Sequence, residues 1–375
     1  MKKKYIILSI ITLVLLIAFV TSFNYFKTKN DYVEDNVNNQ TKIIKGISMN
    51  LEQTAGAGDY KQVTQSSWPT EGYEFNAELS KCENGSTLSW DDKKKAIIVS
   101  GNLSDKCYVY FDIWIPPSIA EYVKSQYTGT QGDNALYYHN STLTNGAGDN
   151  SYRYAGASDS VNNYICLGSD KATCPDANLF RIIGVFGDQT KVIRAKSVGD
   201  KAWHSSTSSD NTWSSLSLNT YLNGTYLTSL GTLADKIATT TWKVGGESST
   251  YLYDVPTTTY QYEVGSSAST TTYEAKIGLM YASDYGFAAS SSAWTTKLSS
   301  YSSNTSKNWL YLGSYEWTIS RNSGTATDAF DVTSTGSVNY CTVTAGFAAR
   351  PSFNLESSVK YVSGSGSMSD PVRVN

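Results

Sequence analysis

The clearest hydrophobic pattern in the chain is a pair of short apolar segments separated by two turn residues. Leu179 to Phe186 is rich in β-branched and aromatic residues, and Thr190 to Ala195 alternates between apolar and polar positions. Between them, Gly187 and Asp188 can adopt the positive φ that a two-residue hairpin turn needs. The pattern therefore predicts a β-hairpin. Its first strand is apolar on both faces except at Arg181, which is typical of a central strand covered by another sheet or a helix.

Short apolar segments also follow one another closely between residues 42 and 115, separated by Gly, Pro, Asn and Asp. These segments are Lys42–Glu52, Tyr60–Gln65, Tyr73–Leu79, Thr87–Trp90, Ala96–Ser100 and Cys107–Trp114. Regularly spaced short strands with turn signals predict a small β-sandwich domain over 42–115.

A connector of helix and loop is expected over 116–163. Ser118 precedes the segment Ile119 to Tyr127, and Glu121 follows Ser118 by three positions, which is the capping-box pattern of a helix start. Residues 128–163 are rich in Gly, Asn, Tyr and Ser without periodicity, so they predict loop.

Residues 164–375 are expected to form a second, larger domain of mixed structure. The spacing of leucine and tyrosine from Trp213 to Leu230 fits helical turns, and residues 248–272 are expected to form an exposed hairpin or long loop. Further strands are predicted at Thr240–Val244, Ala275–Ser283, Tyr315–Ser320, Phe330–Val332, Val338–Thr344 and Ala349–Leu355. The predicted fold class is therefore α+β and β-rich.

The N-terminus carries an apolar run from Tyr5 to Val20 directly after three lysines, Lys2 to Lys4. This pattern predicts a signal anchor or transmembrane helix over 1–26, with the membrane contacted through residues 5–26 and everything after it exported. Residues 27–41 are acidic and Asn-rich and predict a stalk. A cleaved signal peptide, with cleavage near Ser22, is the alternative. The expected location is the cell membrane, with a single pass and the C-terminal bulk outside.

Composition supports a folded, extracellular protein. Charged residues make up only 17% of the chain, whereas it contains 28 Tyr, 9 Trp and 11 Phe, so it has the aromatic content needed to bury apolar area. The formal net charge of −3 does not favour a nucleic-acid partner.

The five cysteines predict two disulfides. Proximity in an exported chain pairs Cys82 with Cys107 and Cys166 with Cys174, which leaves Cys341 over. Cys341 lies in an apolar strand pattern and is expected to be a buried small hydrophobe. The Cys and His spacings of metal sites are missing, so no metal is predicted.

No catalytic residue is predicted, and the chain is not expected to be an enzyme or to use a cofactor. A Gly-x-Ser-x-Gly elbow, a phosphate-binding glycine loop and a calcium loop are all missing from the sequence. The acids of the second domain show no pattern that selects a catalytic pair.

Aromatic residues are the remaining candidates for function. Trp203, His204, Trp213 and Trp294 lie in Ser-, Asn- or Ala-rich stretches. If exposed, such side chains could stack on sugar rings or anchor a protein partner. The alternative is that these tryptophans fill the core of a Gly- and Ser-rich β protein.

Several motifs resemble a set of surface proteins of gut Firmicutes and Mollicutes-like bacteria. The motifs begin at Tyr127 (Tyr-Thr-Gly-Thr-Gln-Gly-Asp-Asn), Gly146 (Gly-Ala-Gly-Asp-Asn-Ser-Tyr-Arg-Tyr-Ala-Gly), Asn163 (Asn-Tyr-Ile-Cys-Leu-Gly) and Leu179 (Leu-Phe-Arg-Ile-Ile-Gly-Val-Phe-Gly). The late segments Glu316–Arg321 and Gly346–Leu355 are similar to strands of a domain of unknown function with a C-type-lectin-like or formylglycine-generating-enzyme-like fold.

This resemblance implies surface display of a C-type-lectin-like domain over 164–375. The Glu-Pro-Asn and Gln-Pro-Asp triplets of calcium-dependent lectins and the copper-binding cysteines of the enzyme branch do not occur here. The expected function is therefore ligand binding or adhesion without catalysis, with a glycan or a host or cell-surface protein as ligand. The alternative is a structural or pilin-like envelope subunit.

Overall fold

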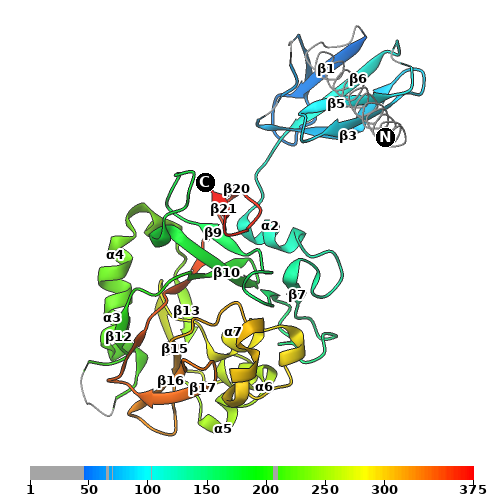
Figure 1. The fold of residues 1–375 in the computed structure, drawn as a ribbon. Coiled ribbons are helices and arrows are strands. Elements are labelled where there is room, and N and C mark those ends of the chain that lie inside the picture. The colour runs from blue at the N-terminus through cyan, green and yellow to red at the C-terminus, as the bar shows by residue number, and fades with distance from the viewer. Residues whose placement is uncertain (1–45, 65–66, 70, 103, 206–209) are drawn as a thin grey trace, which may run out of the picture. The chain divides into compact units, whose positions relative to one another are not determined.

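The computed structural model describes residues 46–64, 67–69, 71–102, 104–205 and 210–375 (Figure 1). The chain divides into two compact units, one ending at Ile115 and the other starting at Pro116. The anchor predicted over 1–26 and the stalk predicted over 27–41 lie outside the described residues. Within the described part of the chain, no helix is both long enough and apolar enough to cross a membrane.

The first unit is built from two sheets that share one core. Its four-stranded sheet has the order β2-β1-β6-β3, and a separate hairpin pairs β4 with β5. The strands are β1 (Ile47–Glu52), β2 (Tyr60–Val63), β3 (Tyr73–Cys82), β4 (Thr87–Asp91), β5 (Ala96–Ser100) and β6 (Cys107–Ile113). The alternating residues Val109 and Phe111 are buried, and Trp90 and Ile97 of the hairpin pack against them. The first unit is thus β-rich, with the apolar faces of its four-stranded sheet and its hairpin packed together.

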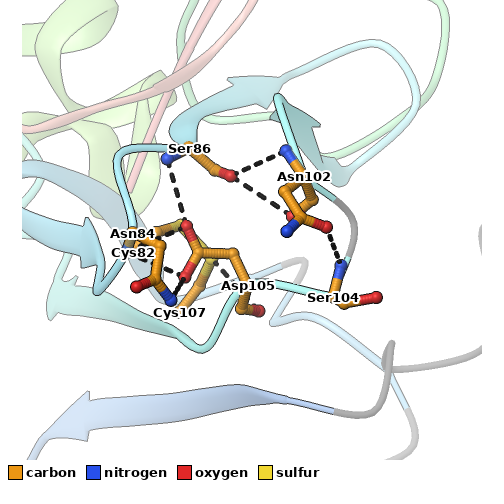
Figure 2. The surroundings of a disulfide bond; sticks show 7 residues. All are labelled: Cys82, Asn84, Ser86, Asn102, Ser104, Asp105 and Cys107. Carbon is orange, nitrogen blue, oxygen red and sulfur yellow. Dashed lines mark hydrogen bonds between the residues drawn. A yellow bond between two sulfur atoms is a disulfide. The ribbon is translucent and has the colours of Figure 1, made fainter.

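The predicted disulfide Cys82–Cys107 is present and joins the end of β3 to the start of β6 (Figure 2). The neighbouring loop is organised by Asp105, whose carboxylate accepts hydrogen bonds from the backbone N–H groups of Asn84 and Ser86. Burial raises the pKa of Asp105, but these hydrogen bonds outweigh it and hold the pKa below its usual value. The disulfide therefore lies beside a polar turn that is already fixed by an ionised carboxylate.

The second unit is organised around an eight-stranded sheet with the order β19-β11-β10-β9-β21-β20, in which β8 also pairs with β10 and β7 with β8. Its strands are β7 (Leu136–Tyr138), β8 (Tyr152–Tyr154), β9 (Tyr164–Cys166), β10 (Leu179–Phe186), β11 (Gln189–Arg194), β19 (Ser352–Leu355), β20 (Tyr361–Ser363) and β21 (Val372–Val374). The second predicted disulfide, Cys166–Cys174, is present and joins the last residue of β9 to the segment that follows it.

The hairpin predicted from the apolar pattern is confirmed as β10 and β11. Gly187 has φ +63° in the connecting turn, as a two-residue turn requires. A side chain at Gly184 would place its Cβ only 2.2 Å from the carbonyl oxygen of Tyr152, so glycine there allows β8 to approach β10. Every residue of β10 except Phe186 is buried, which makes it the central strand.

The hairpin shares its core with the end of the chain. Strand β19 pairs with β11, and the rings of Phe180 and Phe353 meet with centroids 5.2 Å apart. Segments separated by more than 150 positions therefore bury one another's apolar faces, which neither could do alone.

Two smaller sheets and several short helices complete the second unit (Figure 1). The five-stranded sheet has the order β12-β18-β15-β16-β17, and β13 pairs with β14. These strands are β12 (Asp200–Ala202), β13 (Thr240–Lys243), β14 (Thr272–Ala275), β15 (Glu316–Arg321), β16 (Asp328–Val332), β17 (Val338–Thr342) and β18 (Gly346–Ala348). The second unit is thus α+β and β-rich.

The helices of the second unit are short. The α-helices are α2 (Ile119–Ser125), α3 (Ser217–Tyr221), α4 (Leu227–Ser229), α5 (Ser249–Leu252), α6 (Pro256–Glu263) and α7 (Ala282–Phe287). The 3₁₀ turns are η1 (Asp133–Ala135), η2 (Asp176–Asn178), η3 (Trp213–Ser215), η5 (Gly231–Lys236), η6 (Ser291–Ala293) and η7 (Leu298–Lys307), and η4 (Leu222–Tyr226) is π-helical. The capping box predicted at Ser118 and Glu121 is formed at the start of α2.

Three segments differ from the sequence expectation. Residues 248–272, expected to be a hairpin or loop, contain α5 and α6, with Leu252 and Thr259 fully buried. The strand expected from Ala275 to Ser283 is not formed: Ala275 is the last residue of β14, Gly278 makes only an isolated bridge with Ser352, and α7 begins at Ala282. Residues 116–163, expected to be a connector of helix and loop, contribute β7 and β8 to the main sheet and group with the second unit.

Candidate functional site

The candidate tryptophans are core residues. Trp203, Trp213 and Trp294 expose at most 1% of their surface. The indole N–H of Trp203 donates to the carbonyl oxygen of Thr318 at 3.0 Å, and that of Trp294 donates to the carbonyl oxygen of Ala289 at 2.9 Å. The expectation that they contact a ligand is therefore wrong. Their rings are packed in the hydrophobic core of this β-rich unit.

The four aromatic candidates also do not meet in one place. Trp203 packs on Trp213 with ring centroids 5.4 Å apart, whereas Trp294 belongs to a separate cluster with His139, 5.1 Å away. His204 is half-buried, and its backbone N–H donates to the carbonyl oxygen of Val343. The aromatic pattern alone did not select a site.

The remaining cysteine also departs from its expected environment. Cys341 is unpaired on β17 and half-buried, where the apolar pattern predicted full burial. Its neighbours Tyr340 and Thr342 are exposed because β17 lies at an edge of its sheet. Among the described residues, no cluster of three or more His, Cys, Asp or Glu side chains could hold a metal ion.

A pocket of ≈ 200 Å³ in the second unit combines aromatic walls with buried charges. We call it the Lys191 pocket and define it by six of its lining residues, Arg153, Lys191, Trp242, Tyr260, Tyr281 and Asp284. They come from β8, β11, β13, α6, the residue before α7, and α7, so the main sheet and the helical segment both form its walls.

Lys191 and Asp284 form the central ion pair of this pocket. The Nζ of Lys191 lies 2.5 Å from Oδ2 of Asp284, and both side chains are almost completely buried. Burial lowers the pKa of the Lys191 amine, and the charge of Asp284 opposes that shift. Lys191 also lies 4.4 Å from the ring centroid of Tyr281 and 5.3 Å from that of Trp242, where the ring faces stabilise a cation.

Arg153 supplies a second buried cation. Its Nη2 donates to Asp149 at 2.7 Å and its Nε to Ser151 at 2.8 Å, while its Nη1 lies 3.6 Å from Oδ1 of Asp284. Its guanidinium lies 5.1 Å from the ring centroid of Tyr260. Burial raises the pKa of Asp149, but the charge of Arg153 and the bonds from Ser151 outweigh this and lower the pKa to about 2.

The local sequence at the start of α7 holds Asp284 in place. Asp284 accepts a hydrogen bond from the backbone N–H of Tyr281 at 2.9 Å, which forms the second half of a capping box. Glu263, at the end of α6, accepts from the N–H groups of Ala282 and Ser283 at 2.9 Å each. Glu263 thus satisfies the first two N–H groups of the helix and Asp284 that of the N-cap residue, and burial raises the pKa of Glu263.

The Lys191 pocket can bind a small polar group against aromatic rings. It offers donors, acceptors and charge of both signs, and its charged side chains are buried, where hydrogen bonds are strengthened. Arg153, Lys191 and Asp284 were not among the residues predicted from the sequence. The signal that could have found them is a lone charged residue in an apolar stretch, since such residues are rarely buried without a partner.

Comparison of the chain with protein-family models, with curated proteins and with solved structures found no match.

Proposed function

We propose that this protein is an extracellular ligand-binding or adhesion module, held at the cell membrane by residues 1–26, and that the Lys191 pocket is its binding site. The two disulfides support an oxidising environment outside the cytosol. The module binds its ligand without changing it chemically.

The observation that carries this proposal is the buried ion cluster at the floor of the pocket. Arg153, Lys191 and Asp284 each expose no more than 5% of their surface. Buried ion pairs are costly to desolvate, and apolar residues of similar volume usually stabilise a core as well or better. A cluster of buried charges at an aromatic pocket is therefore better explained by recognition of a ligand than by stability.

A pocket-blocking substitution tests the binding site. Thr241 is exposed on β13 and lines the pocket, so Thr241→Trp adds a large side chain to the pocket lining. Thr342→Trp is the matched control, because Thr342 is also an exposed strand residue but lies in the five-stranded sheet. Full-length protein in detergent micelles is applied to a glycan array and to cell-surface extracts.

We expect the wild type and Thr342→Trp to bind the same ligand and Thr241→Trp to lose it. Equal binding by all three proteins would place the site elsewhere on the molecule. If no ligand is retained by the wild type, and size-exclusion chromatography shows self-association, the alternative role as an envelope or assembly subunit replaces this one.

Protease treatment of intact cells tests the proposed location. A single pass through residues 1–26 with the N-terminus inside leaves residues 42–375 outside, so added protease should digest the bulk of the chain. Protection of the whole chain, or recovery of a soluble form that begins near Phe23, would contradict membrane retention.

A further inference from the structure

Arg153 and Asp284 each keep one polar atom without a hydrogen bond in the Lys191 pocket. In the described part of the chain, no hydrogen bond is made by Nη1 of Arg153 or by Oδ1 of Asp284, which form a long ion-pair contact of 3.6 Å with each other. The other polar atoms of these two side chains are in use. The Nε and Nη2 of Arg153 donate hydrogen bonds to Ser151 and Asp149. Oδ2 of Asp284 accepts hydrogen bonds from Nζ of Lys191 and from the backbone N–H of Tyr281.

We propose that this pair of atoms binds a neutral sugar through two adjacent hydroxyl groups. One hydroxyl accepts a hydrogen bond from Nη1 of Arg153, and its neighbour donates one to Oδ1 of Asp284. A hydroxyl can act in both directions, whereas a guanidinium only donates and a carboxylate only accepts. The proposal rests on the proposed function of the Lys191 pocket as a ligand site and names the class of ligand.

The charges around the pocket favour a neutral ligand. An anion would approach Asp284 and Asp149, and a cation would approach Lys191 and Arg153. A carboxylate ligand would normally take two parallel N–H groups of an arginine, but only Nη1 of Arg153 is available. A hydrogen-bond donor directly beside an acceptor matches a vicinal diol better than a fully charged group.

The pocket walls and size favour a single sugar ring. The half-buried ring of Tyr260 lines the pocket and offers an aromatic face on which the apolar face of a pyranose can stack. Asn354 also lines the pocket and is 8% exposed, and its side-chain carbonyl oxygen has no partner, so it can accept from a further hydroxyl. A volume of ≈ 200 Å³ is below the about 300–1,000 Å³ of pockets for drug-sized ligands, which limits the occupant to about one ring.

The test is a titration of the full chain in detergent micelles followed by ligand-observed NMR. The probes are glucose, galactose, mannose, fucose and N-acetylglucosamine as neutral sugars, with glycine, acetate and inorganic phosphate as charged competitors. Arg153→Lys keeps the positive charge but loses the planar fork, so a single amine must serve Asp149 and the ligand. We expect at least one neutral sugar to bind and Arg153→Lys to weaken it about tenfold or more.

Arg350→Lys is the matched control, because Arg350 is equally buried in the same unit and does not line the pocket. It should loosen the fold without changing sugar affinity below its melting temperature. Thr241→Trp should abolish sugar binding. A sugar signal that is equal in the wild type, Thr241→Trp and Arg153→Lys would overturn the proposal.

Different results would contradict the sugar ligand and the binding role of the pocket. If glycine, acetate or phosphate binds, Thr241→Trp removes it, and no neutral sugar binds, the sugar proposal is wrong while the pocket remains a ligand site. If no probe binds and the array and extracts give no signal sensitive to Thr241→Trp, the proposed function is wrong as well.

Discussion

The second unit contains two buried arginine–carboxylate pairs, one closed and one open. Arg350 donates from Nε and Nη2 to the two oxygens of Glu316, at 2.6 and 2.8 Å, and its Nη2 also donates to the carbonyl oxygen of Leu310. In the other pair, Nη1 of Arg153 and Oδ1 of Asp284 remain 3.6 Å apart. Both pairs are almost completely buried, so burial alone does not explain the difference.

The comparison separates a structural ion pair from a candidate site. The bidentate geometry of Arg350 and Glu316 uses both carboxylate oxygens and leaves no room for another group between the partners. The pair of Arg153 and Asp284 is incomplete and lines a pocket. A buried arginine that binds its carboxylate directly through two hydrogen bonds contributes to the fold, whereas one that lies 3.6 Å from a carboxylate beside a cavity is available for recognition.

Breaking the closed pair should have the largest effect. Glu316→Gln keeps the shape of the side chain but leaves the guanidinium of Arg350 without a counter-charge in the core. We expect a loss of about 3–5 kcal/mol in the free energy of unfolding, measured by urea denaturation. Glu274→Gln, at an exposed position of β14, is the control and should change stability by less than about 0.5 kcal/mol. Equal effects of the two substitutions would contradict the structural role of the closed pair.

A third buried acid, Asp331, differs from the acids of both pairs because its carboxylate accepts no hydrogen bond in the described part of the chain. Asp331 on β16 is 1% exposed, and neither of its carboxylate oxygens has a hydrogen bond in the described part of the chain. Burial raises its pKa to about 7. Between its unfolded pKa of 3.8 and about 7, the folded state therefore holds the proton more tightly than the unfolded state. This contribution to stability is present at acid pH and is lost as the pH rises through about 7.

Asp331→Asn should remove the loss of stability that the wild type shows as the pH rises through about 7. We expect the variant to gain at most about 4 kcal/mol over the wild type at pH 8, and to differ little from it at pH 4, where the aspartic acid is already neutral. Thermal or urea unfolding at the two pH values measures the difference. A gain that is the same at both pH values would show that Asp331 is not held neutral in the folded protein.

The sequence predicted the parts of this fold that depend on local pattern. The hairpin of β10 and β11 was predicted because its apolar alternation and the turn at Gly187 are encoded within a few positions. The helices α5 and α6 were missed because Thr and Tyr are poor helix formers, and burial of Leu252 and Thr259 against the core overrides that preference. The same tertiary packing buries the tryptophans that composition alone suggested as ligand contacts.

The Lys191 pocket could not be predicted from one sequence. Lys191 and Asp284 are 93 positions apart, and Arg153 lies on a strand in a segment that was expected to be loop. Each is unremarkable by itself, and only the pairing of β8 and β11 on either side of β10 brings the two cations together. Arg181, which the pattern did mark as an exception, is satisfied by Asn163 and Ser158 and is structural.

Lys191→Met tests the open cluster itself and should have a smaller effect than Glu316→Gln. Methionine fills the space beside Trp242 and Tyr281, and Asp284 keeps Arg153 and the N–H of Tyr281 as partners. We expect a loss of about 2–3 kcal/mol in the free energy of unfolding, the usual cost of a hydrogen bond to a charged group. If Lys191→Met lowered the free energy of unfolding as much as Glu316→Gln does, the cluster around Lys191 would be a structural ion pair like that of Arg350 and Glu316.

Lys196→Met should have the smallest effect, although Lys196 pairs with Asp176 at the same 2.5 Å that separates Lys191 from Asp284. Both side chains of the Lys196 pair are more than 60% exposed, so water and salt screen the attraction and both partners are solvated when apart. We expect a change within about 0.5 kcal/mol by urea denaturation at physiological salt. A loss from Lys196→Met that equals the loss from Lys191→Met would mean that distance decides the strength of these pairs. The separation of closed, open and exposed pairs by burial and hydrogen bonding would then fail.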